Sequence, residues 1–276
     1  MRILIIADLH LDLWDHAKRD PFGPMPPIFQ TLDAVIIAGD LSNDPMKNWP
    51  CALARISRLI EPSKVWVVPG NHDYYGWNLA GDDDLRTLAE QAGMHFAQKT
   101  SVELGGVRFL CCTLWTDFNL HSEPHVSKVI AQRAMNDYFQ IHREPIGSDL
   151  IHPDDVLKKH REHLAWLARE LDKAFDGRTV IVTHHCPSRS ALGPDNRLAP
   201  AYCSDLDQVM VRSPADLWLF GHTHRRLSGR SNNIPVVNVS LGYPREVADH
   251  HIVDIFMRGL IDTAIPGPFG VGRSWT

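Results

Sequence analysis

The 276-residue chain lacks the features that mark secreted and membrane proteins. Its five cysteines are an odd number and include the adjacent pair Cys111-Cys112, so they do not predict a disulfide framework and indicate a reducing compartment. No apolar run approaches the length of a membrane span, and the N-terminal run 3–7 is interrupted by Asp8 too soon for a signal peptide. We therefore expect a cytoplasmic protein that does not associate with membranes.

Positive charge and linker-like composition are also scarce. The net charge is −5 and no long basic run occurs, so the charge pattern of a general nucleic-acid binder is missing and nucleic acid is not the expected partner. No internal repeat, low-complexity tract or linker rich in glycine and serine divides the chain. A single domain of this length buries about three quarters of its extended surface. We predict one domain over residues 1–276, with a core that needs no cross-links.

The sequence does contain short apolar runs that end in residues able to bind metals or carry protons. The five runs are 3–7, 34–38, 64–68, 179–183 and 216–220. They are followed in turn by Asp8 and His10, by Gly39-Asp40, by Gly70-Asn71-His72-Asp73, by His184-His185 and by Gly221-His222-Thr223-His224. Their length and β-branched composition are typical of strands.

The order of these runs predicts where the polar residues lie. The helical pattern of residues 52–60, between the second and third runs, gives a βαβ order, which favours a sheet of parallel strands. The carboxyl ends of parallel strands meet at one edge, and open α/β sheets bind their ligands there. We therefore expect the polar residues after the five runs to converge on one site.

The remaining segments complete the predicted architecture. Their patterns predict an amphipathic helix at 82–92, a hairpin with Gly105-Gly106 at its turn between strands 102–104 and 107–112, a long helix from Pro153 to Phe175, and further strands at 236–239 and 252–256. Residues from about 115 to 152 have weaker periodicity, many polar side chains and one predicted helix at 126–141. We interpret this segment as a helical insertion, or cap, beside the sheet edge.

Taken together, these blocks resemble the calcineurin-like metallophosphoesterases. The blocks are Asp8-x-His10, Gly39-Asp40, Gly70-Asn71-His72-Asp73, His184 and Gly221-His222-x-His224, in that order and each after an apolar run. The resemblance covers most of the chain. It implies an α/β fold of the four-layer α-β-β-α sandwich type, with a two-metal centre in the loops. The predicted cap would be a small helical insertion in this fold.

The resemblance also implies a role for each residue. Asp8, His10 and His224 would hold one metal, Asn71, His184 and His222 the other, and Asp40 would bridge them. His72, paired with Asp73, would contact the scissile phosphate or the leaving group. Because His184 and His185 are adjacent, either could be the ligand, and we favour His184 because it comes first off the strand.

Physical chemistry agrees with this interpretation. Two divalent cations about 3.5–4 Å apart can clamp a phosphate and lower the pKa of a shared water, which supplies hydroxide as the nucleophile. Imidazole, amide and carboxylate donors without thiolate suit Mn²⁺, Fe²⁺/Fe³⁺ or Zn²⁺. We expect a metal-dependent phosphoesterase in which hydroxide attacks phosphorus in line while His72 assists the leaving oxygen. The substrate would be a small phosphomonoester or phosphodiester, and the pattern leaves this choice open.

Two other functions fit the same sequence pattern, and several other residues are candidates for a role at the site. The alternatives are a nuclease of the same superfamily and a non-catalytic scaffold with the same fold, although scaffolds lose ligands and every ligand position is filled here. Four residues are candidates for substrate contact, because they follow the sheet edge or lie in the predicted cap: Asp117, Asn119, Tyr138 and Arg143. Cys186 is interpreted as a packed thiol, and His160 and His163 as helix residues without a metal role.

Overall fold

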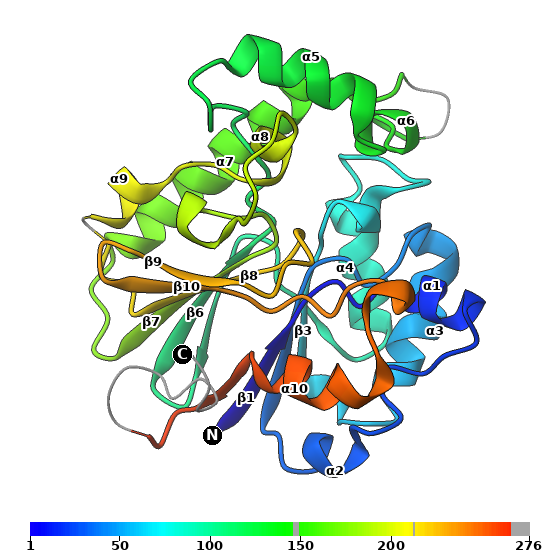
Figure 1. Ribbon diagram of the computed structural model, residues 1–276. Helices are drawn as coiled ribbons and strands as arrows, with labels where there is room; N and C mark the ends of the chain where they lie inside the picture. The colour runs from blue at the N-terminus through cyan, green and yellow to red at the C-terminus, as the bar shows by residue number, and fades with distance from the viewer. Residues whose placement is uncertain (146–148, 212, 266–276) are drawn as a thin grey trace.

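The computed structural model describes residues 1–145, 149–211 and 213–265, and these build two β-sheets packed face to face with helices outside them (Figure 1). Apolar side chains of both sheets meet in one inner core, and each sheet has a second apolar cluster on its outer face. The layers are therefore helices, sheet, sheet and helices, which confirms the predicted four-layer α/β sandwich.

The first sheet contains three of the five predicted strands. In the order β11-β1-β2-β3-β4 it consists of Leu260–Asp262, Arg2–Ile6, Ala34–Ala38, Val65–Val68 and His95–Phe96. The strands β1 to β4 are parallel, and β11 pairs antiparallel at the edge. Ile3 and Ile5 belong to the core between the sheets, whereas Leu4 and Ile6 belong to the core under the helices. These runs are continuously apolar because both faces of the sheet are covered.

The second sheet contains the other two predicted strands. In the order β5-β6-β7-β8-β10-β9 it consists of Thr100–Leu104, Val107–Cys112, Arg178–Thr183, Leu217–Phe220, Ile234–Asn238 and Ser228–Ser231. The central strands β6, β7, β8 and β10 are parallel, and β5 and β9 pair antiparallel at the two edges. The predicted hairpin turn at Gly105-Gly106 joins β5 to β6.

Helices cover both outer faces and one end of the sandwich. Those that pack with the first sheet are α1 (Leu11–His16), α2 (Pro26–Phe29), α3 (Pro45–Ile56), α4 (Asp82–Gln91) and α10 (Ile252–Met257). The others are α5 (Pro124–Ala134), α6 (Asp137–Gln140), α7 (Pro153–Leu171), α8 (Ala199–Tyr202) and α9 (Asp207–Met210). Short 3₁₀ turns occur at Pro62–Lys64, His72–Tyr74, Arg189–Ala191, Pro244–Glu246 and Asp249–His251. Among the described helices, none is long and apolar enough to cross a bilayer.

Two predicted elements were wrong. Residues 252–256 form helix α10 instead of a strand, because Ile252, Ile255 and Phe256 are buried at helical spacing, a pattern that a short apolar run does not distinguish from a strand. The helix predicted at 126–141 is interrupted at Met135, whose extended backbone (φ −88°, ψ 134°) ends α5 and lets α6 begin in a new direction. The long helix α7 also ends at Leu171, before Phe175.

The predicted cap contains α5 and α6. Both lie over the end of the sandwich toward which the parallel strands run (Figure 1). Part of the segment, 146–148, is outside the described residues. That residues 115–152 are an insertion within a single domain stays a prediction.

Candidate metal centre

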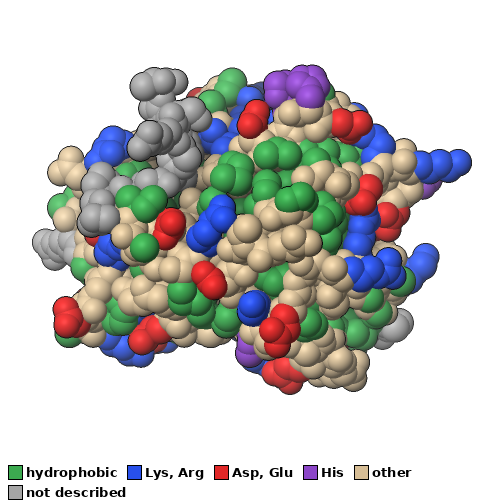
Figure 2. All heavy atoms as spheres, turned by 90° about the horizontal axis from the view of Figure 1, so that it is seen from below, with side chains coloured by type: hydrophobic (Ala, Val, Ile, Leu, Met, Phe, Trp, Pro, Cys, Tyr) green, Lys and Arg blue, Asp and Glu red, His purple; other side chains and the backbone are tan. Residues whose placement is uncertain are grey.

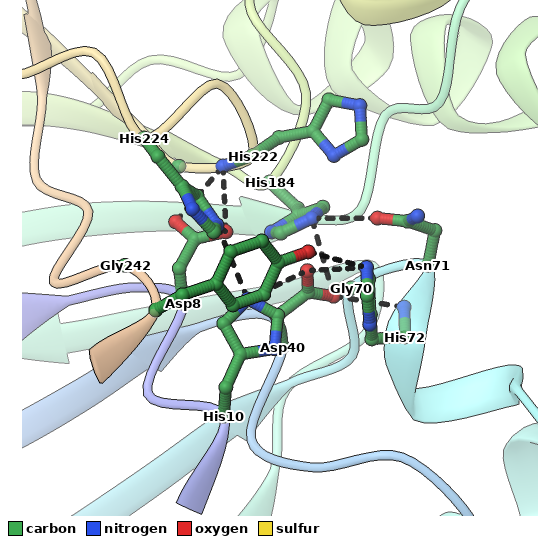
Figure 3. A network of polar contacts seen from close by, with 12 residues as sticks. Asp8, His10, Asp40, Gly70, Asn71, His72, His184, His222, His224 and Gly242 are labelled. Carbon is green, nitrogen blue, oxygen red and sulfur yellow. Dashed lines mark hydrogen bonds and ion pairs between the residues drawn. The ribbon is translucent and has the colours of Figure 1, made fainter. Parts of the chain in front are cut away.

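The predicted ligands converge at the carboxyl ends of strands from both sheets (Figure 3). Asp8 and His10 follow β1, Asp40 follows β2, Asn71 and His72 follow β3, His184 follows β7, and His222 and His224 follow β8. Among the described residues, the His and Asp side chains of this set form overlapping clusters of three, and the ligand atoms within each cluster lie within 4.8 Å of one another. The sheet edges thus bring together side chains that are more than 200 residues apart in sequence, such as His10 and His224.

The backbone at five of these residues is strained. Asp8, His10, Asp40, His222 and His224 have φ angles of 58°, 41°, 59°, 65° and 52°. The left-handed region costs an L-residue roughly 1–2 kcal/mol, so the surrounding loops must impose it. One such restraint is visible, because the His222 backbone N–H donates to both Asp8 oxygens, at 3.0 and 2.9 Å. Strain of this kind is typical of sites in which side chains are held in place for a ligand.

Glycines let the ligand side chains approach the backbone. A Cβ atom at Gly39, whose φ is 95°, would overlap the His184 ring, and one at Gly70 would overlap the Asp40 carboxylate. Glycine is required at both positions because only hydrogen leaves this space open. The sequence Gly-Asp after β2 and Gly-Asn after β3 therefore places the two loops in direct contact.

Asp40 lies between two groups of donors (Figure 3). Its Oδ2 atom is 3.6 Å from His10 Nε2, and its Oδ1 atom is 3.3 Å from His184 Nε2. The side chain is 1 % exposed, and Oδ1 also accepts the His72 backbone N–H at 2.9 Å. One carboxylate thus presents a different oxygen to each group, which is the arrangement of a bridging ligand.

The first group consists of Asp8, His10 and His224. His10 Nε2 and His224 Nε2 are 3.1 Å apart, and His224 Nε2 is 3.2 Å from Asp8 Oδ1. On its other side, His224 Nδ1 donates to Glu246 Oε2 at 2.8 Å, which leaves Nε2 with a lone pair toward the cluster. Two imidazole lone pairs and a carboxylate that face one another repel unless a cation or proton lies among them. The donor set therefore fits a bound metal ion.

The second group consists of His184, Asn71 and two further histidines. His184 Nδ1 donates to the Ala38 carbonyl at 3.0 Å, so its Nε2 points at Asn71 Oδ1, also 3.0 Å away. His222 is turned away from Asp40 (Figure 3), its ring stacks 4.1 Å from the His185 ring, and its buried Nε2 has no partner among the described residues. His184, His185 and His222 can still share one ion. His184 also forms a cluster with the carboxylates of Asp8 and Asp40, and among the described residues its neighbour His185 does not.

The pKa values of the histidines also indicate that the site favours positive charge. Burial alone would lower the pKa of His184, but the neighbouring Asp40 carboxylate raises it to about 9. For His224, Asp8 and Glu246 overcome burial in the same way and raise the pKa to about 10. Burial, together with the neighbouring His185 and His184 imidazoles, keeps the pKa of His222 well below its usual value. His184 and His224 thus hold their protons more tightly than free imidazoles do, and metal binding would release these protons.

The predicted pairing of His72 with Asp73 is wrong. The 3₁₀ turn at 72–74 directs His72 to the surface of the site and Asp73 into the loops below it. The Asp73 carboxylate accepts N–H groups at 2.8–3.1 Å from Gly70, Asp40, Leu41, Ser42 and Trp49. His72 is oriented instead by Asn43, whose Oδ1 accepts from His72 Nδ1 at 2.7 Å. Asp73 therefore holds the Asp40 and Asn71 loops together and does not brace the imidazole.

A cavity of about 340 Å³ opens onto these residues. Its floor includes Asp40, Asn71, His72, His222 and His224. Its walls come from the end of α5, from the segment 192–202 that contains α8, and from Arg225, Tyr243 and Glu246. The volume lies in the range of small-molecule sites.

Comparison with known proteins identifies the family. The sequence pattern of the family described as calcineurin-like phosphoesterase matches residues 1–226. The chain belongs to this family. It is therefore a metallophosphoesterase, a hydrolase of phosphoric esters, and its buried His and Asp clusters are consistent with the metal centre of such enzymes.

One relative in sequence and two solved structures are similar to the chain. An uncharacterized protein, L509, of Acanthamoeba polyphaga mimivirus is 27 % identical over 281 residues, which covers 89 % of this chain and 93 % of the relative. The crystal structure of phosphopantetheinyl hydrolase from Mycobacterium tuberculosis is similar with a TM-score of 0.64 and 20 % identity, over 88 % of this chain and 90 % of that one. A putative 5′-nucleotidase from Staphylococcus aureus reaches a TM-score of 0.50 at 16 % identity, over 86 % of this chain and 48 % of that one.

The candidates for substrate contact are not brought to the metallophosphoesterase site, because none of the four lines its cavity. Tyr138 is packed in the core, and Arg143 is paired with Asp155 at 3.1 Å. Asp117 accepts the Asn119 backbone N–H in a local turn. The residues excluded from a metal role have structural ones: Cys186 is buried, and His160 and His163 bind the backbone of Leu114 at 3.1 and 3.0 Å.

The sequence did not predict five residues of the site, which are three tyrosines and two residues of the predicted cap. Tyr75, Tyr202, Tyr243 and Asn136 line the cavity, and Asp137 lies beneath it. The buried Asp137 carboxylate accepts from Asn71 Nδ2 at 2.8 Å and from the Tyr75 hydroxyl at 2.5 Å, which turns the oxygen of the Asn71 amide toward His184. Tyr75 lies close to the Asn71-His72 block and could have been suspected, but no local sequence signal marks the others.

Proposed function

We propose that the chain hydrolyses a small phosphoric ester with a dinuclear metal centre. Asp8, His10 and His224 would hold one ion, Asn71, His184 and His222 the other, and Asp40 would bridge the pair. The observation that carries this proposal is that the two oxygens of Asp40 face His10 and His184 separately, at 3.6 and 3.3 Å. The backbone N–H of His222 is already bonded to Asp8, so a rotation of the His222 side chain alone would bring its ring to the second ion.

The bound ions would neutralise the phosphate and activate the attacking water, and Mn²⁺, Fe²⁺/Fe³⁺ or Zn²⁺ suits the donor set. The chain's own residues perform the remaining tasks. His72 is fixed by Asn43 at Nδ1 and stacks on Tyr75 at 4.1 Å, so its Nε2 is held beside the site, 4.0 Å from Asp40 Oδ2. From that position it can donate a proton to the leaving oxygen. The nearby Tyr243 hydroxyl, 3.4 Å from His72 Nε2, can take part in the same hydrogen bond.

The alternative functions find less support. Every position that the ligand set requires is filled, which argues against a non-catalytic scaffold. At the lower end of Figure 1, viewed in Figure 2, acidic and basic side chains are interspersed and no basic patch gathers. That end lies opposite the metal site (Figure 1). At the site itself, Arg225 is the one Lys or Arg side chain among the residues that line the cavity, and with a net charge of −5 this does not favour a nuclease. We propose a small phosphorylated substrate in the cytoplasm, as the sequence indicated.

The test measures bound metal as well as turnover. Elemental analysis of purified wild type loaded with Mn²⁺ should give about two ions per chain, and Asp40→Asn should bind one or none and lose phosphoesterase turnover. The matched control is Asp33→Asn, because Asp33 precedes the same strand, β2, at its opposite end and accepts only from Arg2 in the described structure. A wild type that stays inactive and binds less than one ion would overturn the proposal.

A further inference from the structure

A second cavity adjoins the metal site on the far side of His72. It has a volume of about 500 Å³ and is lined by residues of α1, by Asn43 and Gln140, and by the segment 243–245. The two cavities share four lining residues, which are His72, Tyr75, Asn136 and Tyr243. Apart from His72, none of the predicted catalytic or metal-binding residues lines the second cavity. It is a separate chamber that opens beside the imidazole of His72.

The walls of the second cavity suit an organic group. Leu13, Ala17 and Pro244 supply apolar surface, and Tyr75 and Tyr243 supply aromatic rings. Each of the two volumes, 340 and 500 Å³, falls in the range of sites for complete small molecules. Each chamber is therefore large enough for a substituent of its own, in addition to the phosphoryl group at the ligands.

The position of His72 decides which chamber takes the leaving group. Its ring stacks on Tyr75 at a centroid distance of 4.1 Å, meets His10 edge-on at 4.7 Å and donates from Nδ1 to Asn43, and these contacts hold it where the two cavities meet. A leaving oxygen that takes its proton from His72 must lie at the boundary, and the group attached to that oxygen then extends into the second cavity. This leaves the outer part of the first cavity, with Met135, Leu198 and Tyr202, for a second substituent on phosphorus.

We infer that the substrate is a phosphodiester with its leaving alcohol in the second cavity and its retained organic group in the first. This inference rests on the proposed function and narrows it. In the reaction, the water oxygen bonds to phosphorus, the bond from phosphorus to the leaving oxygen breaks, and that oxygen takes a proton from His72 and departs as the alcohol. The proton lost by water restores His72, and the retained group stays on the product phosphomonoester.

Two alanines allow each chamber to be filled separately. Ala134 at the end of α5 lines only the first cavity, and Ala17 at the end of α1 lines only the second. Both are exposed, so tryptophan at either position has room for the fold to form. Ala168→Trp, on the exposed side of α7 and in neither lining, is the matched control.

The experiment compares bis(p-nitrophenyl) phosphate with p-nitrophenyl phosphate in Mn²⁺-loaded protein. Wild type should have at least a tenfold higher kcat/KM for the diester, equivalent to about 1.4 kcal/mol. Ala134→Trp should lower the ratio of diester to monoester kcat/KM about tenfold, whereas Ala17→Trp should lower both values and keep their ratio. Ala168→Trp should match wild type, and all three should bind as much Mn²⁺ as wild type.

The outcomes separate this inference from the proposed function. A wild type that prefers the monoester would overturn the diester assignment and leave the hydrolase intact. An Ala134→Trp variant with an unchanged ratio would show that no second substituent occupies the first cavity. If neither ester were hydrolysed, and no metal were bound, the proposed function itself would fail.

Discussion

The loops that carry the metal ligands and the wall of the cavity above them differ in how they are specified. In the loops, residues chosen because they follow apolar runs lie within hydrogen-bonding distance of one another, as His10 and His224 do at 3.1 Å. In the wall, none of the four residues chosen from the sequence lines the cavity, and the tyrosines that do were not singled out. The comparison suggests that chemistry is set by the sheets and substrate choice by the segments between them.

The cause of this difference is geometric. Parallel strands end at a common edge, so a residue directly after one strand is placed by a regular ladder of hydrogen bonds. The cavity wall is built from irregular segments whose direction depends on single events, such as the extended backbone at Met135 that separates α5 from α6. The following predictions test whether the two regions are as independent as this contrast suggests.

After Asp40→Asn, the largest effect is expected at His72, which also lies in the loops. His72→Ala should lose roughly 10²- to 10⁴-fold in kcat on an ester with an alkoxide-like leaving group, the usual contribution of a general acid. The loss should be smaller for p-nitrophenyl esters, whose leaving phenolate needs little protonation. Mn²⁺ content should match wild type, because the ring nitrogens face Asn43 and Tyr243.

Equal losses on both kinds of ester would rule out proton donation and favour charge stabilisation of the phosphoryl oxygens. A variant that loses metal would show that His72 is a ligand instead, which its cluster with His10 and Asp40 permits. Asn43→Ala sharpens the test, because it leaves His72 in place and removes the acceptor that fixes its tautomer, together with one hydrogen bond from Asn43 to Asp12. It should show a smaller loss with the same dependence on the leaving group.

A smaller effect is expected where the cap reaches the loops. Asp137 of α6 orients Asn71 through the hydrogen bond of 2.8 Å to Asn71 Nδ2, so Asp137→Ala should free the amide to rotate. Loss of such an outer partner typically lowers metal affinity about 10- to 100-fold. Calorimetric titration with Mn²⁺ should show the weakening at one of two sites, since Asn71 is the one proposed ligand whose side chain bonds to Asp137 in the described structure.

The matched control is Asp149→Ala, another carboxylate of the predicted cap, which lines neither cavity. It should bind both ions as wild type does. If Asp137→Ala also did so, the cap would have no part in metal binding and the two regions would be independent. Rescue of the second site by Asp137→Asn, whose oxygen can still accept from Asn71, would identify the hydrogen bond and not the charge as the cause.

Some parts of the site could be predicted from the sequence and others could not. The strands and the ligands after them were accessible, because β-branched runs and the residues at their ends are local signals. The hydrogen-bond partner of His72 could not be predicted, because Asn43 and His72 are 29 residues apart and the 3₁₀ turn at 72–74 decides which side chain faces the site. Helix α10 was missed because a five-residue apolar run carries too little periodicity to distinguish helix from strand. Asp137 was missed because its role depends on where the chain turns after Met135.

The smallest expected effect compares two arginines, one chosen from the sequence and one found in the cavity wall. Arg225 is exposed at the wall beside His222 and His224, so a substrate phosphate or its substituent can reach it. Arg225→Ala should raise KM about three- to tenfold, or about 0.7–1.4 kcal/mol, as expected for the loss of one solvent-exposed charged contact.

Arg143 is bound to Asp155 at 3.1 Å and lines neither cavity, so Arg143→Ala should change KM less than twofold. Steady-state kinetics of both variants on the same ester decide the matter. If Arg143→Ala raised KM more than Arg225→Ala did, Arg143 would be the substrate contact that the sequence predicted, and the cap would have to move over the site when substrate binds.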